Sequence, residues 1–248
     1  MIDLSDTSTW PPKVLELLAS TARETRREKS TELAAHLDGS HRHRSLTCSV
    51  YKQTRETLEA LLLDFEIRAF HCTRLLDPES VKRNGLEILS PVTAKLRLLD
   101  SLRQAGVAEN LLASAAQAFD NCENTGEFEH RQGMLWFALN KEMIDGSGCA
   151  DLLQHFGGEI ARHALDSLAD KLFPVLASIG IPCVVEARLP IRDAQPHHLT
   201  ALADEFIRLS WGRFLGERQD ARDCDMMIRR PIEPDRILKV WKRPVRRR

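Results

Sequence analysis

The sequence predicts an α+β protein, and three observations support this fold class. Five or six short segments rich in branched and aromatic residues, such as 182–190, have the length of strands. About seven longer segments repeat apolar residues at intervals of three and four, which is the spacing of a buried helix face. The strand segments are spaced very unevenly along the chain, unlike the regular alternation of a parallel βαβ series.

The composition agrees with a folded chain of moderate size. The protein has 248 residues, of which 43% are hydrophobic and 29% are charged, and its formal net charge is −1. This length suits one large domain, or a smaller domain with a helical extension. The net charge predicts no particular partner, but residues 229–248 carry nine Lys or Arg against Glu233 and Asp235. That basic segment is either a solvated tail or a surface for nucleic acid or an acidic protein.

Cysteine spacing and the N-terminal sequence bear on location. The six cysteines include no Cys-x-x-Cys pair, and no Cys/His set has zinc-finger spacing. Reduced cysteines are typical of cytosolic proteins. The first nine residues lack a basic region followed by an apolar run, and no apolar run approaches the length of a membrane span. We therefore expect a cytoplasmic protein with no metal site and no membrane partner.

The first part of the chain is predicted to be helical. Residues 10–37 place apolar side chains on one face until Asp38 and Gly39 end the pattern, and residues 54–65 form a second amphipathic segment. No catalytic grouping occurs in this region. We therefore predict a helical N-terminal extension over residues 1–65, followed by an α+β domain over residues 66–248.

The α+β domain is predicted to begin with a strand that leads into a short helix. Residues 67–72 read as the strand. Asp77 can cap a helix that has Pro78 in its first turn, and Gly85 suits its end. The polar side chains where the strand ends are those of His71, Thr73 and Arg74. Loops next to strand ends commonly carry functional residues.

The later elements follow from the same signals. The expected helices are 91–105, 109–119, 151–156, 160–179 and 196–214, with the first capped by Ser90. The expected strands are 134–139, 182–190, 226–228 and 237–241. Residues 120–129 and 145–148 are rich in Asn, Gly and acidic residues, and they are predicted to form an exposed loop and a turn.

Three of these segments together resemble the ADP-ribosyltransferase superfamily, in its poly-ADP-ribose-polymerase-like and diphtheria-toxin-like branch. The first is His71-Cys72-Thr73-Arg74 with the later Gly85-Leu86, and the second is the glycine and aromatic strand of 133–138. The third consists of the strands 226–228 and 237–240, which look like the closing hairpin of the family. The resemblance covers residues 67–241. It implies a split sheet of short strands with helical insertions.

The resemblance also implies that NAD is the substrate. His71 and Thr73 would bind the nicotinamide ribose, and backbone groups near Cys72 would hold the carboxamide. The family usually stacks a Tyr on nicotinamide, and Trp136 or Phe137 would take that place. The residues expected to bind the phosphates of the dinucleotide are Arg131 and Arg74.

The family also uses an acidic residue that stabilises positive charge as the glycosidic bond breaks. Three residues are candidates for this role. Glu159 follows two glycines that permit close approach of a ligand, Asp225 begins the last pair of strands, and Glu186 lies on a strand. We favour Glu159 as the catalytic acid, with Asp225 as the second choice.

The predicted function is therefore transfer of ADP-ribose from NAD to a protein or nucleic-acid acceptor, with release of nicotinamide. A bacterial toxin or defence effector is a natural setting for such an enzyme. The alternatives are an NAD hydrolase and a catalytically degenerate interaction module with the same fold. In the second alternative, His71 is a half-buried residue satisfied by a backbone carbonyl, and Trp136 and Phe137 are core aromatics.

Overall fold

The computed structural model describes residues 1–37, 49–88, 90–126, 128, 132–219 and 222–243. Helices and strands are mixed along the described chain, so the predicted α+β class is confirmed. The described strands form a single five-stranded sheet, whereas the resemblance implied a split one. The chain divides into two compact units. Unit 1 contains Met1–Arg68, Ala138–Met143 and Leu189–Met226, and unit 2 contains Ala69–Phe137, Ile144–Arg188 and Met227–Arg248.

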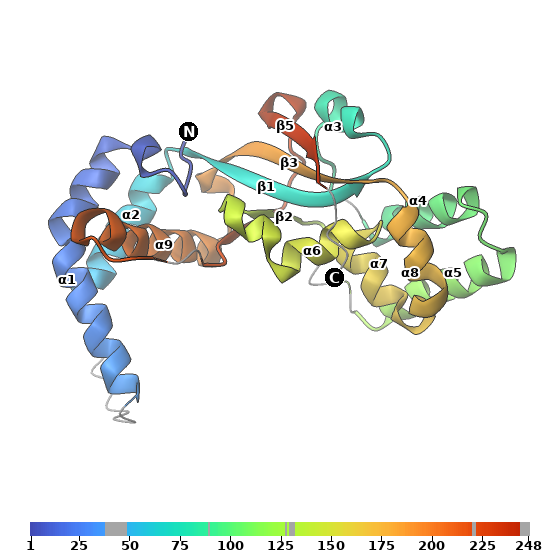
Figure 1. Cartoon of the computed structure of the whole chain (residues 1–248), viewed down its shortest axis with the longest axis horizontal. Coiled ribbons are helices and arrows are strands. Elements are labelled where there is room, and N and C mark those ends of the chain that lie inside the picture. The colour runs from blue at the N-terminus through green and yellow to red at the C-terminus, as the bar shows by residue number, and fades with distance from the viewer. Residues whose placement is uncertain (38–48, 89, 127, 129–131, 220–221, 244–248) are drawn as a thin grey trace. The chain divides into compact units, whose positions relative to one another are not determined.

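The sheet has the strand order β4-β2-β1-β3-β5 (Figure 1). β3 and β5 are antiparallel, with Val185 opposite Val240. β1 and β3 also run antiparallel. The amide of Ile191 donates to the carbonyl of Phe65 at one end of this pair, and Gly180 lies against the carbonyl of Leu75 at the other. The bounds are β1 (Glu66–Leu75), β2 (Leu135–Ala138), β3 (Ile181–Pro190), β4 (Asp225–Ile228) and β5 (Ile237–Lys242).

The predicted closing hairpin is wrong. β4 and β5 lie at opposite edges of the sheet, and their neighbours are β2 and β3. The connection between β4 and β5 does not turn straight back, because Ile232 forms a two-residue bridge with Leu86. The two hydrogen bonds of this bridge have ordinary lengths of 2.8 and 2.9 Å. The main chain therefore satisfies its polar groups against the segment that follows α3 (Pro78–Asn84), and β5 then pairs with β3.

Unit 1 is built on three helices that pack on one another: α1 (Pro12–Leu37), α2 (Val50–Leu62) and α9 (Pro196–Leu215). In the core, the ring centroids of Trp10 and Phe206 are 4.4 Å apart. The sequence predicts a boundary after residue 65, whereas the structure groups α9 with the two N-terminal helices. The grouping results from packing between apolar faces of helices that are far apart in the sequence, and local sequence patterns do not reveal such packing.

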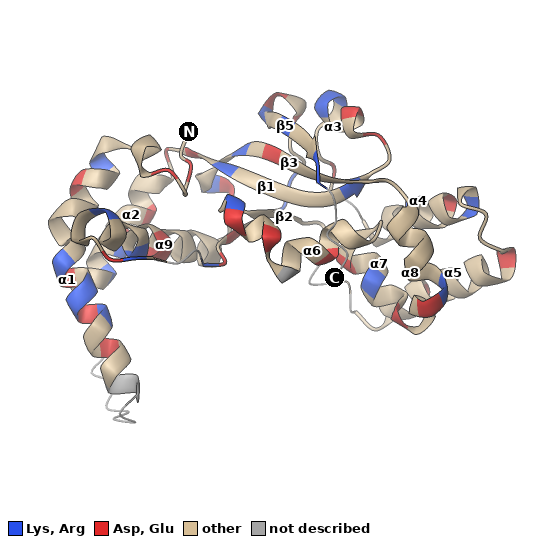
Figure 2. Cartoon of the chain, viewed as in Figure 1, with Lys and Arg blue, Asp and Glu red and all other residues tan. Residues whose placement is uncertain are grey.

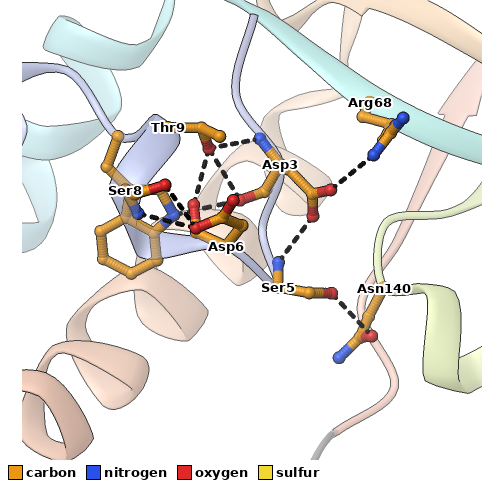
Figure 3. Close-up of polar contacts among 8 residues, drawn as sticks. Asp3, Ser5, Asp6, Ser8, Thr9, Arg68 and Asn140 are labelled. Carbon is orange, nitrogen blue, oxygen red and sulfur yellow. Dashed lines mark hydrogen bonds and ion pairs between the residues drawn. The ribbon is translucent and has the colours of Figure 1, made fainter.

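The first residues of the chain are tied into unit 1, although no element was predicted there (Figure 3). The main chain of Ile2 pairs with the start of β1, in parallel with Ile67. The Asp3 carboxylate forms an ion pair with Arg68 over 2.9 Å. The Ser5 hydroxyl donates to the side-chain oxygen of Asn140 over 3.1 Å. These contacts hold the N-terminal segment against β1 and Asn140.

Unit 2 begins with the strand and helix that the sequence predicted. The Asp77 side chain accepts a hydrogen bond from the Glu79 amide over 3.0 Å, which caps α3 as expected. Gly85 ends the helix with a positive φ of 77°. The other helices are α4 (Pro91–Gln104), α5 (Glu109–Asn124), α6 (Ser147–Gln154), α7 (Gly158–Ala164) and α8 (Ala169–Ser178). α4, α5, α7 and α8 share one apolar core around Leu102, Phe119 and Leu172.

Three local predictions in unit 2 are wrong. The single helix expected over 160–179 is divided into α7, a short 3-10 turn (Asp166–Leu168) and α8. This turn allows Ala161 of α7 and Leu176 of α8 to face the same core. The loop expected over 120–129 begins later, because α5 continues to Asn124. The turn expected at 145–148 ends early, because Ser147 already begins α6.

Candidate functional site

His71 lies on β1 in unit 2, and its orientation is fixed by the neighbouring strand. Its Nδ1 atom is 2.8 Å from the carbonyl oxygen of Trp136 on β2. A carbonyl can only accept a hydrogen bond, so the proton of a neutral imidazole must be on Nδ1. The Nε2 atom then carries a lone pair and can accept a hydrogen bond.

The neutral form of His71 is favoured. Burial lowers the pKa of His71 below its ordinary value of 6.5, and the hydrogen bond to the Trp136 carbonyl opposes this shift. In the part of the chain that the structure describes, hydrogen bonds of this ring involve Nδ1 only. The contact also agrees with the alternative interpretation of a half-buried histidine satisfied by a backbone carbonyl.

The two candidate aromatic residues of β2 have different environments. The ring of Phe137 is 5.5 Å from the ring of His71, and Phe137 is 1% exposed. Trp136 is 37% exposed. Successive side chains of a strand point to opposite faces of the sheet, so Trp136 lies on the face away from Phe137. The aromatic ring next to His71 is therefore buried, and the accessible ring belongs to the other face.

The same alternation separates the four residues of the first motif. His71 and Thr73 share one face of β1, and both are half-buried. Cys72 and Arg74 share the other face. The Cys72 thiol is buried and forms a hydrogen bond with Cys149, and this bond together with burial raises the pKa of Cys72. Cys72 is therefore a neutral thiol, and any role in binding a carboxamide falls to its backbone, as expected.

Arg74 holds two helix ends together. Its guanidinium donates to the carbonyls of Leu153, Ala177, Ile179 and Gly180 over 2.8 to 2.9 Å. These carbonyls belong to the C-terminal turn of α6 and to the end of α8 and the residues after it. The last carbonyls of a helix have no partner within the helix, and a cation there also complements the helix dipole. Four donors are thus committed to structure, so we leave Arg74 out of the proposed phosphate-binding residues.

Glu159 is an exposed residue in the first turn of α7. It lines a polar cleft of about 680 Å³ in unit 2. His71 is not among the described residues that line this cleft. Its walls come from α5, α7 and the following 3-10 turn, and consist of Ala118, Asn121, Cys122, Glu159, Arg162, His163, Ala164, Asp166 and Ser167.

The other two candidate acids, Asp225 and Glu186, each lie near a basic residue. Asp225 belongs to unit 1, where its Oδ1 atom is 3.2 Å from Nδ1 of His198. Glu186 is buried on β3 and lies opposite Lys239 in the register of β5. Arg131, the second residue expected to bind phosphate, lies outside the described residues.

The His198–Asp225 pair was not found from the sequence. His198 is 5% exposed in the first turn of α9. Burial lowers the pKa of His198, and the Asp225 carboxylate opposes that shift. The two residues are 27 positions apart and belong to different elements, so no local pattern connects them. Only the adjacent histidines 197 and 198 mark the position in the sequence.

Further findings bear on the class of protein. Within the described ranges, no helix has both the length and the apolar character needed to cross a membrane. The described residues also include no group of three or more His, Cys, Asp or Glu side chains arranged to hold a metal ion. Comparisons of the chain with models of protein families, with curated proteins and with solved structures found no match.

Proposed function

We propose that unit 2 binds NAD and transfers its ADP-ribose to a macromolecular acceptor, with release of nicotinamide. The observation that carries this proposal is the state of His71. Its ring is oriented by the Trp136 carbonyl, and its neutral form presents Nε2 as an acceptor. The resemblance to ADP-ribosyltransferases assigns a ribose-binding histidine to this position.

The chemistry of the face supports binding of a ribose. A ribose hydroxyl can donate a hydrogen bond to Nε2 of His71, and the Thr73 hydroxyl on the same face can donate or accept a second bond. The burial that lowers the pKa of His71 keeps this acceptor available at neutral pH. A protonated ring would have donors on both nitrogens and would lose that interaction.

Glu159 is the acid that we propose to assist cleavage of the bond between ribose and nicotinamide. A carboxylate stabilises the positive charge that develops on the ribose as this bond breaks. Glu159 belongs to the same compact unit as His71. Asp225, by contrast, is paired with His198 in unit 1.

A catalytically degenerate NAD-binding or interaction module is the second candidate. One observation favours it: the aromatic ring beside His71 belongs to Phe137, which is 1% exposed and offers no open face for nicotinamide to stack on. The two candidates differ in turnover. An enzyme releases nicotinamide, whereas the module binds a partner without consuming NAD.

The test of the proposal is release of nicotinamide from labelled NAD by the full chain. We expect release by the wild-type protein and a loss of about 100-fold in His71→Ala, a typical cost of removing one positioned hydrogen-bonding group. His197→Ala is the matched control, because His197 is an exposed histidine of unit 1. A wild-type protein that neither binds NAD nor releases nicotinamide would overturn the proposal, whereas binding without release would favour the degenerate module.

Isosteric variants separate the candidate acids. Glu159→Gln is expected to reduce nicotinamide release strongly, while Asp225→Asn and Glu186→Gln retain it. Loss of activity in Asp225→Asn with activity kept in Glu159→Gln would move the catalytic acid to β4. Transfer of label to added protein or nucleic acid, compared with free ADP-ribose, distinguishes a transferase from an NAD hydrolase.

A further inference from the structure

Three cations of unit 2 are exposed and have no ion pair among the described residues: Arg229, Lys239 and Lys242. They belong to the segment after β4 and to β5. This part of the chain packs against α3, which contacts both β5 and the 3-10 turn (Pro234–Arg236) that precedes it. The three cations therefore lie along one continuous segment of the chain, with Arg229 next to the end of β4 and the two lysines on β5.

A rigid junction holds these elements together. Leu86 and Ile232 exchange two backbone hydrogen bonds, which tie the end of α3 to the connection between β4 and β5. A Cβ atom at Gly85 would lie 1.9 Å from the carbonyl oxygen of Ile232. Only glycine permits this approach, and its φ of 77° is also unfavourable for other residues. The position of the basic segment against α3 is thus built into the fold.

We term the side chains of α3, of β5 and of the connection between β4 and β5 the α3–β5 surface. Basic residues outnumber acidic ones in these elements, and Figure 2 colours both kinds along the ribbon. The α3–β5 surface holds eight cations against the four carboxylates of Asp77, Glu79, Glu233 and Asp235, in a chain whose net charge is −1. Asp77 and Glu79 are paired with cations of α3, Asp235 is paired with Arg188, and Arg243 is paired with Asp145. The eight cations are Lys82, Arg83, Arg229, Arg230, Arg236, Lys239, Lys242 and Arg243.

An aromatic side chain lies within this surface. Trp241 is half-buried on β5, and the ammonium of Lys239 lies 5.8 Å from the centroid of its ring. β5 is the edge strand of the sheet among the described elements, so these side chains stand at its margin. Lys239 and Trp241 share one face of β5, whereas Lys242 lies on the other face. A cation beside an aromatic ring is found on surfaces that follow a phosphate backbone and contact bases.

We infer that the α3–β5 surface binds the phosphate backbone of a nucleic acid. Its unpaired cations would neutralise phosphates and release counterions, and the planar guanidinium groups of its arginines can donate paired hydrogen bonds to phosphate oxygens. An acidic protein could also form ion pairs with these cations, but it has no bases to stack on the exposed part of the indole ring. This inference does not depend on NAD activity, because it concerns different residues from those proposed to bind NAD.

The test is fluorescence anisotropy of a labelled single-stranded oligonucleotide with the full chain at increasing salt. Three phosphate contacts on a single strand would account for roughly a 20-fold fall in affinity between about 50 and 200 mM salt. The triple variant Arg229→Gln/Lys239→Gln/Lys242→Gln should lose at least that much affinity at low salt and have a shallower salt dependence. The matched control Lys13→Gln/Arg23→Gln/Arg27→Gln removes three exposed cations from α1 and should bind like the wild type.

Three outcomes would overturn the inference. In the first outcome, the wild type binds no oligonucleotide at low salt. In the second, the α1 control loses as much affinity as the α3–β5 variant. In the third outcome, poly-glutamate would bind at least as tightly as the oligonucleotide and would lose binding in the same variant, which would indicate an acidic protein as the partner. Circular dichroism of both triple variants verifies that they fold. Because nicotinamide release is measured separately, failure of this inference is distinguishable from failure of the proposed function.

Discussion

Arg74 is expected to be one of the most important residues for the stability of unit 2. Replacing it with Met keeps much of the volume of the side chain and removes all four hydrogen bonds to the ends of α6 and α8. A hydrogen bond that involves a charged group contributes about 1.5 to 3 kcal/mol, and contributions within one network are not additive. The bond to Ala177 is solvent-exposed, which leaves three part-buried carbonyls to lose their partner.

We therefore expect Arg74→Met to lower the free energy of unfolding by about 3 to 4 kcal/mol. Arg74→Lys keeps the charge but lacks the planar fork, so about half of this loss is expected. Urea unfolding followed by circular dichroism measures both values. The control is Arg83→Met, whose exposed ion pair with Asp77 should be worth less than about 1 kcal/mol. A loss for Arg74→Met no larger than that of the control would refute the role assigned to Arg74.

Three further predictions follow from single contacts. Gly85→Ala should destabilise the protein by more than Gly106→Ala, because both glycines have a positive φ but only at Gly85 would a Cβ atom meet a backbone carbonyl; urea midpoints that do not differ would contradict this. Burial lowers the pKa of His155 below 6.5. The neutral ring therefore contributes to the stability of the folded protein above pH 6.5, and this contribution is lost as the pH falls below that value, since protonation then favours the unfolded chain. The unfolding free energy of His155→Phe should decrease less than that of the wild type between about pH 7 and 5, and equal decreases would contradict the assignment. Asp225→Asn should lower the pKa of His198 further in an NMR titration, because the carboxylate favours the charged imidazole; an unchanged or raised pKa would show that the pair does not form.

Local chemistry explains what the sequence could predict. The short helix α3 was predicted with its cap, its first-turn proline and its terminating glycine, because each of these signals acts within a few residues. The strands β1 and β3 were also predicted, since runs of branched and aromatic residues between turn signals have few other solutions. The α+β class follows from such elements without knowledge of their order in the sheet.

Long-range contacts explain what could not be predicted. The assignment of β4 and β5 to opposite edges depends on the bridge between Leu86 and Ile232, which are 146 residues apart. The division of the predicted helix 160–179 depends on a core shared with α4 and α5. The packing of α9 on the N-terminal helices likewise depends on apolar faces that meet only in the folded chain.

The candidate site shows the same division. The sequence placed His71 on a strand, and the structure confirms that strand. The partner of its Nδ1 atom is a backbone carbonyl, which every residue possesses and which no pattern can single out. The carbonyls that accept hydrogen bonds from Arg74 are equally invisible in the sequence, where only the charge of this residue could be used to predict its role.

The proposed role of His71 is tested by the rate of nicotinamide release from NAD, compared between the wild type and His71→Ala. We expect release by the wild type and a fall of about 100-fold in the variant, with His197→Ala unchanged. Equal rates in the wild type and His71→Ala would contradict the role of His71. A wild-type chain that neither binds nor cleaves NAD would contradict the proposed function as a whole.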